Sequence, residues 1–131
     1  MSHFHAVVWI DHKEAKVFHF NKDEADKVAV KAGDTSHLRH HANVTGSSHA
    51  KTSEAYLHEV CHAVADAGAI LITGPGVAKT ELIHHMHKHD PQVAKKVAAI
   101  ETVDHPTDGQ LLAHARKYFK SADLETPQIQ R

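Results

Sequence analysis

The first quarter of the chain alternates between apolar and polar positions in the way that is typical of β-strands. Residues 4–10 are apolar on both parities, which predicts a strand buried on both faces. A turn over 11–13 and a second alternation over 14–20 predict a hairpin. Residues 26–32 place valines on one face and lysines on the other, as expected of an exposed third strand. The sheet is therefore expected to begin as an antiparallel meander.

The second half of the chain alternates between helical and strand patterns. A cap at Thr52 or Ser53 and a capping box formed by Thr107 and Gln110 mark the starts of the first and last helices. Apolar spacing predicts helices over about 53–66, 77–89, 91–95 and from 107 onward, and strands over 69–73 and 97–103. We expect an α/β fold of one domain over residues 1–120, with a mixed sheet of about five strands flanked by helices, and a loosely ordered tail over 121–131.

Between the strand-rich first quarter and the second half, residues 33–51 have almost no apolar periodicity and are rich in Gly, Ser, Thr and His. Connections of this length are uncommon inside a domain and are more often functional or disordered than neutral. The cations of this predicted loop are Arg39 and Lys51, and His40 and His41 lie between them. The loop is a candidate binding segment.

Composition narrows the class of protein. A chain of 131 residues suits one domain, and 41% hydrophobic with 24% charged residues is ordinary for a globular protein. The single cysteine, Cys61, excludes an internal disulfide and a cysteine-based zinc cluster. No segment approaches the ~20 apolar residues of a membrane span, and the polar start lacks the apolar run of a signal peptide. We expect a cytoplasmic protein with no membrane partner.

Histidine changes this picture, because its 16 residues equal the 16 of Asp plus Glu and exceed the 15 of Lys plus Arg. The formal charge of −1 treats every histidine as neutral. At an ordinary pKa near 6.5, about a quarter of them carry a proton at pH 7, which adds roughly +4. The composition therefore permits both metal binding and pH-dependent binding of anions.

The segment 73–80 lies at a predicted strand-to-helix junction, where backbone N–H groups favour an anion. It is not a Walker A phosphate loop, because Thr73 and Ala78 occupy the two glycine positions of that motif. Two interpretations stay open. Gly74 and Gly76 supply unusual backbone angles in a turn stiffened by Pro75, or the Lys79 ammonium makes a weak contact with an anion.

Three residues, His58, Glu59 and His62, match the helical H-E-x-x-H spacing that holds zinc with a glutamate as general base. Glu81 lies where a third ligand of such a site falls. However, a chain this rich in histidine produces such matches by chance, and the apolar stripe of the same helix turns both imidazoles sideways or outward. A histidine-rich metal-binding protein or zinc hydrolase is the alternative function, and we assign no cofactor.

A second histidine-rich stretch, 84–90, offers the imidazole pairs His84/His87 and His85/His89 on what we expect to be the outer face of a helix. Such pairs bind added Ni²⁺, Cu²⁺ or Zn²⁺ with modest affinity in any protein. A solvated polar face is the favoured interpretation. Cys61 occupies the apolar stripe of its helix and is expected in the core.

Two segments carry a family resemblance. Residues 7–18, VVWIDHKEAKVF, and residues 70–82, ILITGPGVAKTEL, resemble the opening hairpin and the strand, G-P-G turn and lysine-bearing helix of one protein family. Tyr56 and the strand at 97–103 fall in the matching order. The family is the middle domain of the eukaryotic and archaeal class-1 peptide chain release factor and of its relative Pelota, and the resemblance covers about residues 4–119.

The resemblance implies a ribonuclease-H-like mixed sheet of the kind shared by several components of the translational machinery. It also implies small stand-alone bacterial-type relatives described as translational machinery proteins. In true release factors the loop before the first helix carries Gly-Gly-Gln, which promotes hydrolysis of peptidyl-tRNA. The corresponding residues 40–49 read HHANVTGSSH here, so release catalysis is not expected.

The sequence therefore predicts a translation-related, RNA- or ribosome-associated protein without Gly-Gly-Gln release activity. Its partners are expected to be the ribosome or structured RNA, and a role as a scaffold for another protein stays open. No catalytic residue and no metal ligand is assigned, and an enzyme is not favoured. The residues expected to contact phosphate are Arg39, His40, His41, Lys51 and Lys79.

Overall fold

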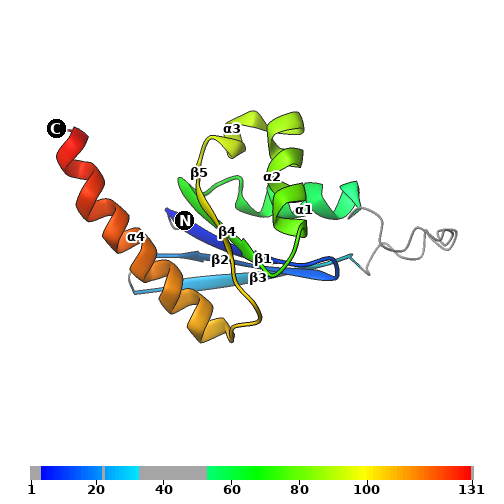
Figure 1. Cartoon of the computed structure of the whole chain (residues 1–131), viewed down its shortest axis with the longest axis horizontal. Helices are drawn as coiled ribbons and strands as arrows, with labels where there is room; N and C mark the ends of the chain where they lie inside the picture. The colour runs from blue at the N-terminus through cyan, green and yellow to red at the C-terminus, as the bar shows by residue number, and fades with distance from the viewer. Residues whose placement is uncertain (1–3, 22, 33–52, 131) are drawn as a thin grey trace, which may run out of the picture.

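The strands and helices follow the order that the sequence pattern predicts (Figure 1). The computed structural model describes the backbone of residues 4–21, 23–32 and 53–130, and the side chains of these residues up to 120. The strands are β1 (His5–Ile10), β2 (Glu14–Phe20), β3 (Ala25–Lys31), β4 (Ala69–Gly74) and β5 (Val97–Thr102). The helices are α1 (Glu54–Val64), α2 (Ala78–His89), α3 (Pro91–Ala94) and α4 (Asp108–Gln130).

The five described strands form one mixed sheet in the order β3-β2-β1-β4-β5. β1 and β2 pair antiparallel, as do β2 and β3, and this is the predicted meander. β4 pairs parallel with β1 on one side and with β5 on the other. The expectation of an α/β domain with a mixed sheet of about five strands flanked by helices is confirmed.

β1 lies at the centre of this sheet and is covered on both faces. Ala6, Val8 and Ile10 are fully buried in the cluster that also contains the inner sides of α1 and α2. Val7 and Trp9 point to the other face, where they pack with α4. Figure 1 shows the same division, with α1, α2 and α3 on one side of the sheet and α4 on the other. The apolar run on both parities of β1 follows from this double burial.

The α1–α2 face is built from two amphipathic helices. Ser53 caps α1, because its Oγ accepts a hydrogen bond from the Tyr56 N–H at 3.4 Å; of the two predicted caps, Thr52 and Ser53, the structure has the serine. Tyr56 is fully buried, and its hydroxyl donates to the carbonyl oxygen of Asp11 at 3.0 Å. Burial raises the pKa of the Tyr56 phenol above its ordinary value. The buried apolar residues of the two helices are Leu57, Val60, Cys61, Val64, Leu82 and Met86.

α4 is held on the opposite face by an apolar stripe and by polar contacts. Leu111, Ala115 and Phe119 are buried against the sheet. The capping box is confirmed, because the Thr107 N–H donates to Gln110 Oε1 at 2.9 Å and the Gln110 N–H donates to Thr107 Oγ1 at 3.1 Å. Asp108, the first residue of α4, accepts hydrogen bonds from Lys16 Nζ at 3.3 Å and from Lys27 Nζ at 2.7 Å. The Arg116 guanidinium donates to the carbonyls of Asn21 and Glu24, both at 3.1 Å. In the segment before α4, the Asp104 carbonyl accepts a hydrogen bond from Trp9 Nε1 at 2.6 Å.

The last helix is longer than expected. Its backbone continues to Gln130, where the sequence pattern predicts a loosely ordered tail. Ala122, Leu124 and Glu125 are good helix formers, and lengthening an existing helix needs no new nucleus. Within the described helices, none combines the length and the apolar character needed to cross a membrane.

Gly74 has a different role from the one expected. The described glycines have no positive φ, so the prediction of unusual backbone angles at Gly74 and Gly76 is wrong. A Cβ at position 74 would instead overlap the backbone carbonyl oxygen of Ile10, because β4 ends close against β1 at this point. A Cβ at position 76 would meet nothing within 4 Å. Close approach of two strands, and not backbone angle, requires the first glycine of the G-P-G turn.

The two glycines therefore form a matched pair. We expect Gly74→Ala to lower the free energy of unfolding by about 1–3 kcal/mol, because a rigid backbone atom blocks the added methyl group. We expect Gly76→Ala to leave it unchanged or to raise it by up to about 1 kcal/mol. Urea unfolding followed by circular dichroism measures both, and equal stability of the two variants would show that β1 and β4 do not need this contact.

Asp108 gives a pH-dependent prediction. The hydrogen bond from Lys27, followed by Lys16, holds the pKa of this carboxyl below its ordinary 3.8, although partial burial opposes the shift. A depressed folded-state pKa means stabilisation that is present above pH 3.8 and is lost as the pH falls through the folded-state pKa. Wild type should exceed Asp108→Asn in stability by less than about 1 kcal/mol at neutral pH, and the difference should vanish in acid.

Urea midpoints measured in steps from pH 7 to pH 2 test this expectation. Asp66→Asn is the control, since it removes the same charge from an exposed position after α1 on the other face of the sheet. A difference between wild type and Asp108→Asn that does not change with pH would contradict the assignment.

Candidate functional site

The carboxyl ends of β1 and β4 form one edge of the sheet, and ligands of open α/β sheets bind at such edges. A cavity of about 200 Å³ lies there. It is lined by residues after β1, by the G-P-G turn after β4 and by the start of α2: Asp11, His12, Pro75, Gly76, Val77 and Ala78. We call it the strand-end cavity.

Polar groups around the strand-end cavity are engaged within the domain. The Asp11 carboxylate accepts hydrogen bonds from the N–H groups of Lys13 at 2.8 Å and Glu14 at 2.9 Å, which holds the β1–β2 turn. The Lys79 ammonium donates to the carbonyl oxygen of Gly76 at 2.6 Å. Lys79, one of the five predicted phosphate contacts, therefore lies on the first turn of α2, and its side chain folds back over the turn that borders this cavity.

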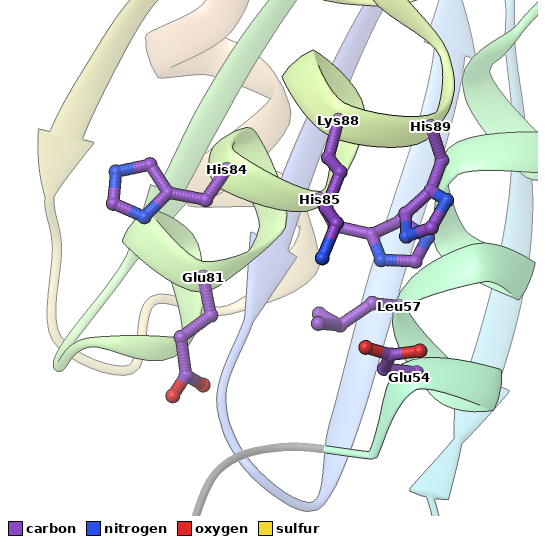
Figure 2. Close-up of a pocket in the computed structure, with 7 residues that line it drawn as sticks. All are labelled: Glu54, Leu57, Glu81, His84, His85, Lys88 and His89. Atoms are coloured by element: carbon purple, nitrogen blue, oxygen red, sulfur yellow. The ribbon is translucent and has the colours of Figure 1, made fainter.

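A second cavity, of about 260 Å³, lies between the first turn of α1 and the side of α2 that faces it. We call it the α1–α2 cavity, and Figure 2 shows its lining: Glu54, Leu57, Glu81, His84, His85, Lys88 and His89. In this view the imidazoles of His85 and His89 lie next to α1 on the side of Glu54, and His84 points away from them. Glu81 also lies 3.9 Å from Nε2 of His12, so the two cavities are neighbours along α2.

His85 is the buried titratable group of this region. Its side chain is 8% exposed, and its Nε2 is buried without a hydrogen-bond partner. The ring centroid lies 4.4 Å from that of His89 and 6.0 Å from that of His58. Burial, followed by the neighbouring His89, lowers the pKa of His85 below its ordinary 6.5, while the Glu54 carboxylate opposes the shift. His85 is therefore held mainly as the neutral imidazole at pH 7.

The predicted outer-face position of His85 is wrong. His85 follows Leu82 by three residues and precedes Met86 by one, so it continues the buried stripe of α2. His89 lies one turn later on the same face of α2, and it also lines the cavity. The spacing of His85 from Leu82 is present in the sequence, but the neighbouring histidines of α2 make His85 hard to distinguish from the exposed ones.

The zinc motif predicted on α1 is not assembled. His58, Glu59 and His62 are all exposed, and only His58 lies toward α2, with its ring centroid 6.0 Å from that of His85. Glu81, the expected third ligand, faces His12 instead. Over residues 4–21, 23–32 and 53–120, no three His, Cys, Asp or Glu side chains are arranged to hold one metal ion. The structure gives no support to a zinc hydrolase built on this motif.

Four of the five predicted phosphate contacts, Arg39, His40, His41 and Lys51, lie outside the described residues. The structure describes the residues on either side of this segment, Ala32 and Ser53. The Ala32 N–H donates to the Lys13 carbonyl at 2.9 Å, and Ser53 caps the helix whose Tyr56 bonds to Asp11. The chain therefore leaves β3 and enters α1 beside the β1–β2 turn, at the same edge as the strand-end cavity.

Cys61 has no role as a nucleophile. It lies in the core, as expected, with 1% exposure. Burial, followed by the Asp90 carboxylate, raises the pKa of its thiol to about 12, so the reactive thiolate is scarce at neutral pH. The chemistry of this region rests on imidazole, carboxylate and ammonium groups.

Comparison with known proteins supports the fold. No protein-family model and no curated protein matches the chain. Among solved structures, it is similar to Pelota of Archaeoglobus fulgidus (TM-score 0.59, 12% identity, 83% of this chain and 29% of that chain) and to Pelota of Thermoplasma acidophilum (0.57, 17%, 83% and 30%). It is also similar to the archaeal translation termination factor aRF1 (0.57, 12%, 96% and 39%).

Identities of 12–17% show a common fold and nothing finer. The chain spans 29–39% of the length of these structures, so it corresponds to one part of each of them. The release factor-like fold expected from the resemblance is confirmed.

The buried thiol allows a direct check of the packing between α1 and the sheet. We expect Ellman's reagent to label Cys61 only when the domain unfolds, because the thiol is both inaccessible and protonated. Labelling rates measured from zero to denaturing urea should follow the unfolded fraction. Rapid labelling of the native protein at neutral pH would show that Cys61 is exposed and that the core placement is wrong.

Proposed function

Because the domain shares its fold with Pelota and with the archaeal termination factor aRF1, we propose that it acts in translation as an RNA- or ribosome-associated protein. The observation that carries the proposal is the similarity to aRF1 over 96% of this chain, which leaves almost none of the domain outside the common fold. The ribosome or structured RNA is the proposed partner, and a protein partner is the second candidate. The ribonuclease-H-like class stays part of the proposal, since the mixed sheet is consistent with it.

The proposed binding surface is the edge that contains the strand-end cavity. Arg39, His40, His41 and Lys51 belong to the segment that joins Ala32 to Ser53, and both of these flanking residues lie at this edge. Lys79 borders the same edge. Its ammonium has three donors, and the bond to Gly76 uses one of them. A phosphate oxygen can therefore bind Lys79 without breaking the turn.

Protonation of histidine would add to this charge. Imidazole gains its proton between about pH 5 and 8, so His40 and His41 would strengthen phosphate binding as the pH falls. The sequence contains no Gly-Gly-Gln, and the proposal therefore includes neither peptide release nor any catalytic residue. It describes a binding role that is driven by charge.

Removing two cations tests the proposal. We expect Arg39→Ala combined with Lys51→Ala to weaken binding to purified ribosomes and to structured RNA, without a change in urea unfolding. Each phosphate contact adds about one to the slope of log K against log salt, so the slope should fall by about two. Co-sedimentation and fluorescence anisotropy at graded salt measure it. Lys79→Gln should lower the slope by about one more.

Lys117→Ala combined with Lys120→Ala is the matched control, because it removes the same formal charge from exposed positions on α4, across the sheet from α2. Binding that weakens equally in both double variants would show that net charge alone attracts RNA. Unchanged binding in the Arg39 and Lys51 variant would contradict the assignment of this segment.

A further inference from the structure

His85 and His89 are paired in a way that the exposed histidines of α2 are not. They are four residues apart and both line the α1–α2 cavity, with ring centroids 4.4 Å apart. This is the spacing at which two imidazoles on one helical face bind zinc. His84, in contrast, points away from them in Figure 2. The chain thus places two imidazoles side by side at the wall of one cavity.

The inner member of the pair has an unsatisfied nitrogen. His85 is 8% exposed, and its Nε2 has no hydrogen-bond partner. Buried polar side-chain atoms almost always have a partner, and a bound water or ion is a common explanation for one that does not. This buried, unpaired nitrogen belongs to a side chain that lines the α1–α2 cavity.

The charge of the lining favours a cation. Two carboxylates, Glu54 and Glu81, border the cavity, against the single ammonium of Lys88. Lys88 is exposed, so its long side chain can turn into the solvent. Imidazole nitrogen suits Zn²⁺, Cu²⁺ and Ni²⁺, whereas Mg²⁺ and Ca²⁺ prefer oxygen ligands. These preferences point to a transition metal.

We propose that His85 and His89 form a two-imidazole site for a divalent transition-metal ion such as Zn²⁺, which Glu54, His58 or water completes. Glu54 and His58 lie on the adjoining turns of α1 and are exposed, so they can rotate toward the ion without disturbing the core. The His58 ring centroid is 6.0 Å from that of His85. The site differs from the motif predicted on α1, because it joins α1 to α2 and uses neither Glu59 nor His62.

The test compares two histidines of the same helical turn. His89→Gln removes a proposed ligand, and His87→Gln removes an exposed imidazole that does not line the cavity. Both positions are exposed, so both variants should fold. Untagged, metal-free protein is titrated with Zn²⁺ against a chromophoric chelator. To remove other imidazoles, His37, His40, His41 and His49 are replaced by Gln in the parent and in both variants.

We expect one tight equivalent of Zn²⁺ in the parent and in His87→Gln, and a loss of affinity of about tenfold or more in His89→Gln. NMR should show Zn²⁺ shifting the ring signals of His85 and His89 ahead of those of His84 and His87. Zn²⁺ affinity that is the same in His89→Gln and His87→Gln, whether reduced or unchanged from the parent, would show adventitious binding by exposed imidazoles and would overturn the proposed site. Neither result depends on whether the protein binds RNA.

Discussion

The burial of β1 on both faces is the constraint on which the rest of this structure depends. Its side chains alternate between two hydrophobic clusters, and its backbone pairs antiparallel with β2 and parallel with β4. A shift of one residue in either pairing would move every side chain to the wrong face. A Cβ at position 74 would overlap the Ile10 carbonyl oxygen, so glycine is needed where β4 ends beside β1. The strand-end cavity lies just beyond this point, lined by residues that follow β1 and β4.

The two faces hold their helices by different means. α1 and α2 bury apolar stripes, and the carbonyls of Ala65 and Ala67 beyond the end of α1 accept hydrogen bonds from Lys96 Nζ at 2.7 and 2.9 Å. α4 combines its stripe with polar contacts to the strands and turns beneath it. Because α1 and α2 cover the same face of the sheet, polar residues of the two helices lie beside each other. They include the imidazoles and carboxylates that line the α1–α2 cavity.

The arrangement separates two kinds of chemistry on one domain. The strand-end edge has the turn backbone, Lys79 and the flanks of the segment 33–52, and it is where we propose contact with phosphate. The α1–α2 cavity has a buried neutral imidazole with a second imidazole beside it, which suits a metal ion. The two lie close together because α2 starts at the first and continues to the second.

Most of the fold could be predicted from the sequence, because the signals are local. Double-parity apolar runs mark β1 and β4, alternation marks β2, and Ser53, Pro91 and the Thr107–Gln110 capping box mark helix starts within a residue or two of where they lie. The long reach of α4 was not predicted, since helix extension after a strong start leaves no distinct pattern. The role of Gly74 was also not predicted, because Ile10, the neighbour that requires a glycine there, is distant in the sequence.

The candidate site shows the same division. The sequence by itself determined which residues could bind: a histidine-rich chain, a G-P-G turn with Lys79, and the imidazole spacings on each helix. The tertiary structure decided which of them meet. It left His62 outside, brought His58 toward His85 and buried His85 between Leu82 and Met86. Spacing along a helix is set by its own backbone, whereas the approach of two helices is set by the sheet face that both of them cover.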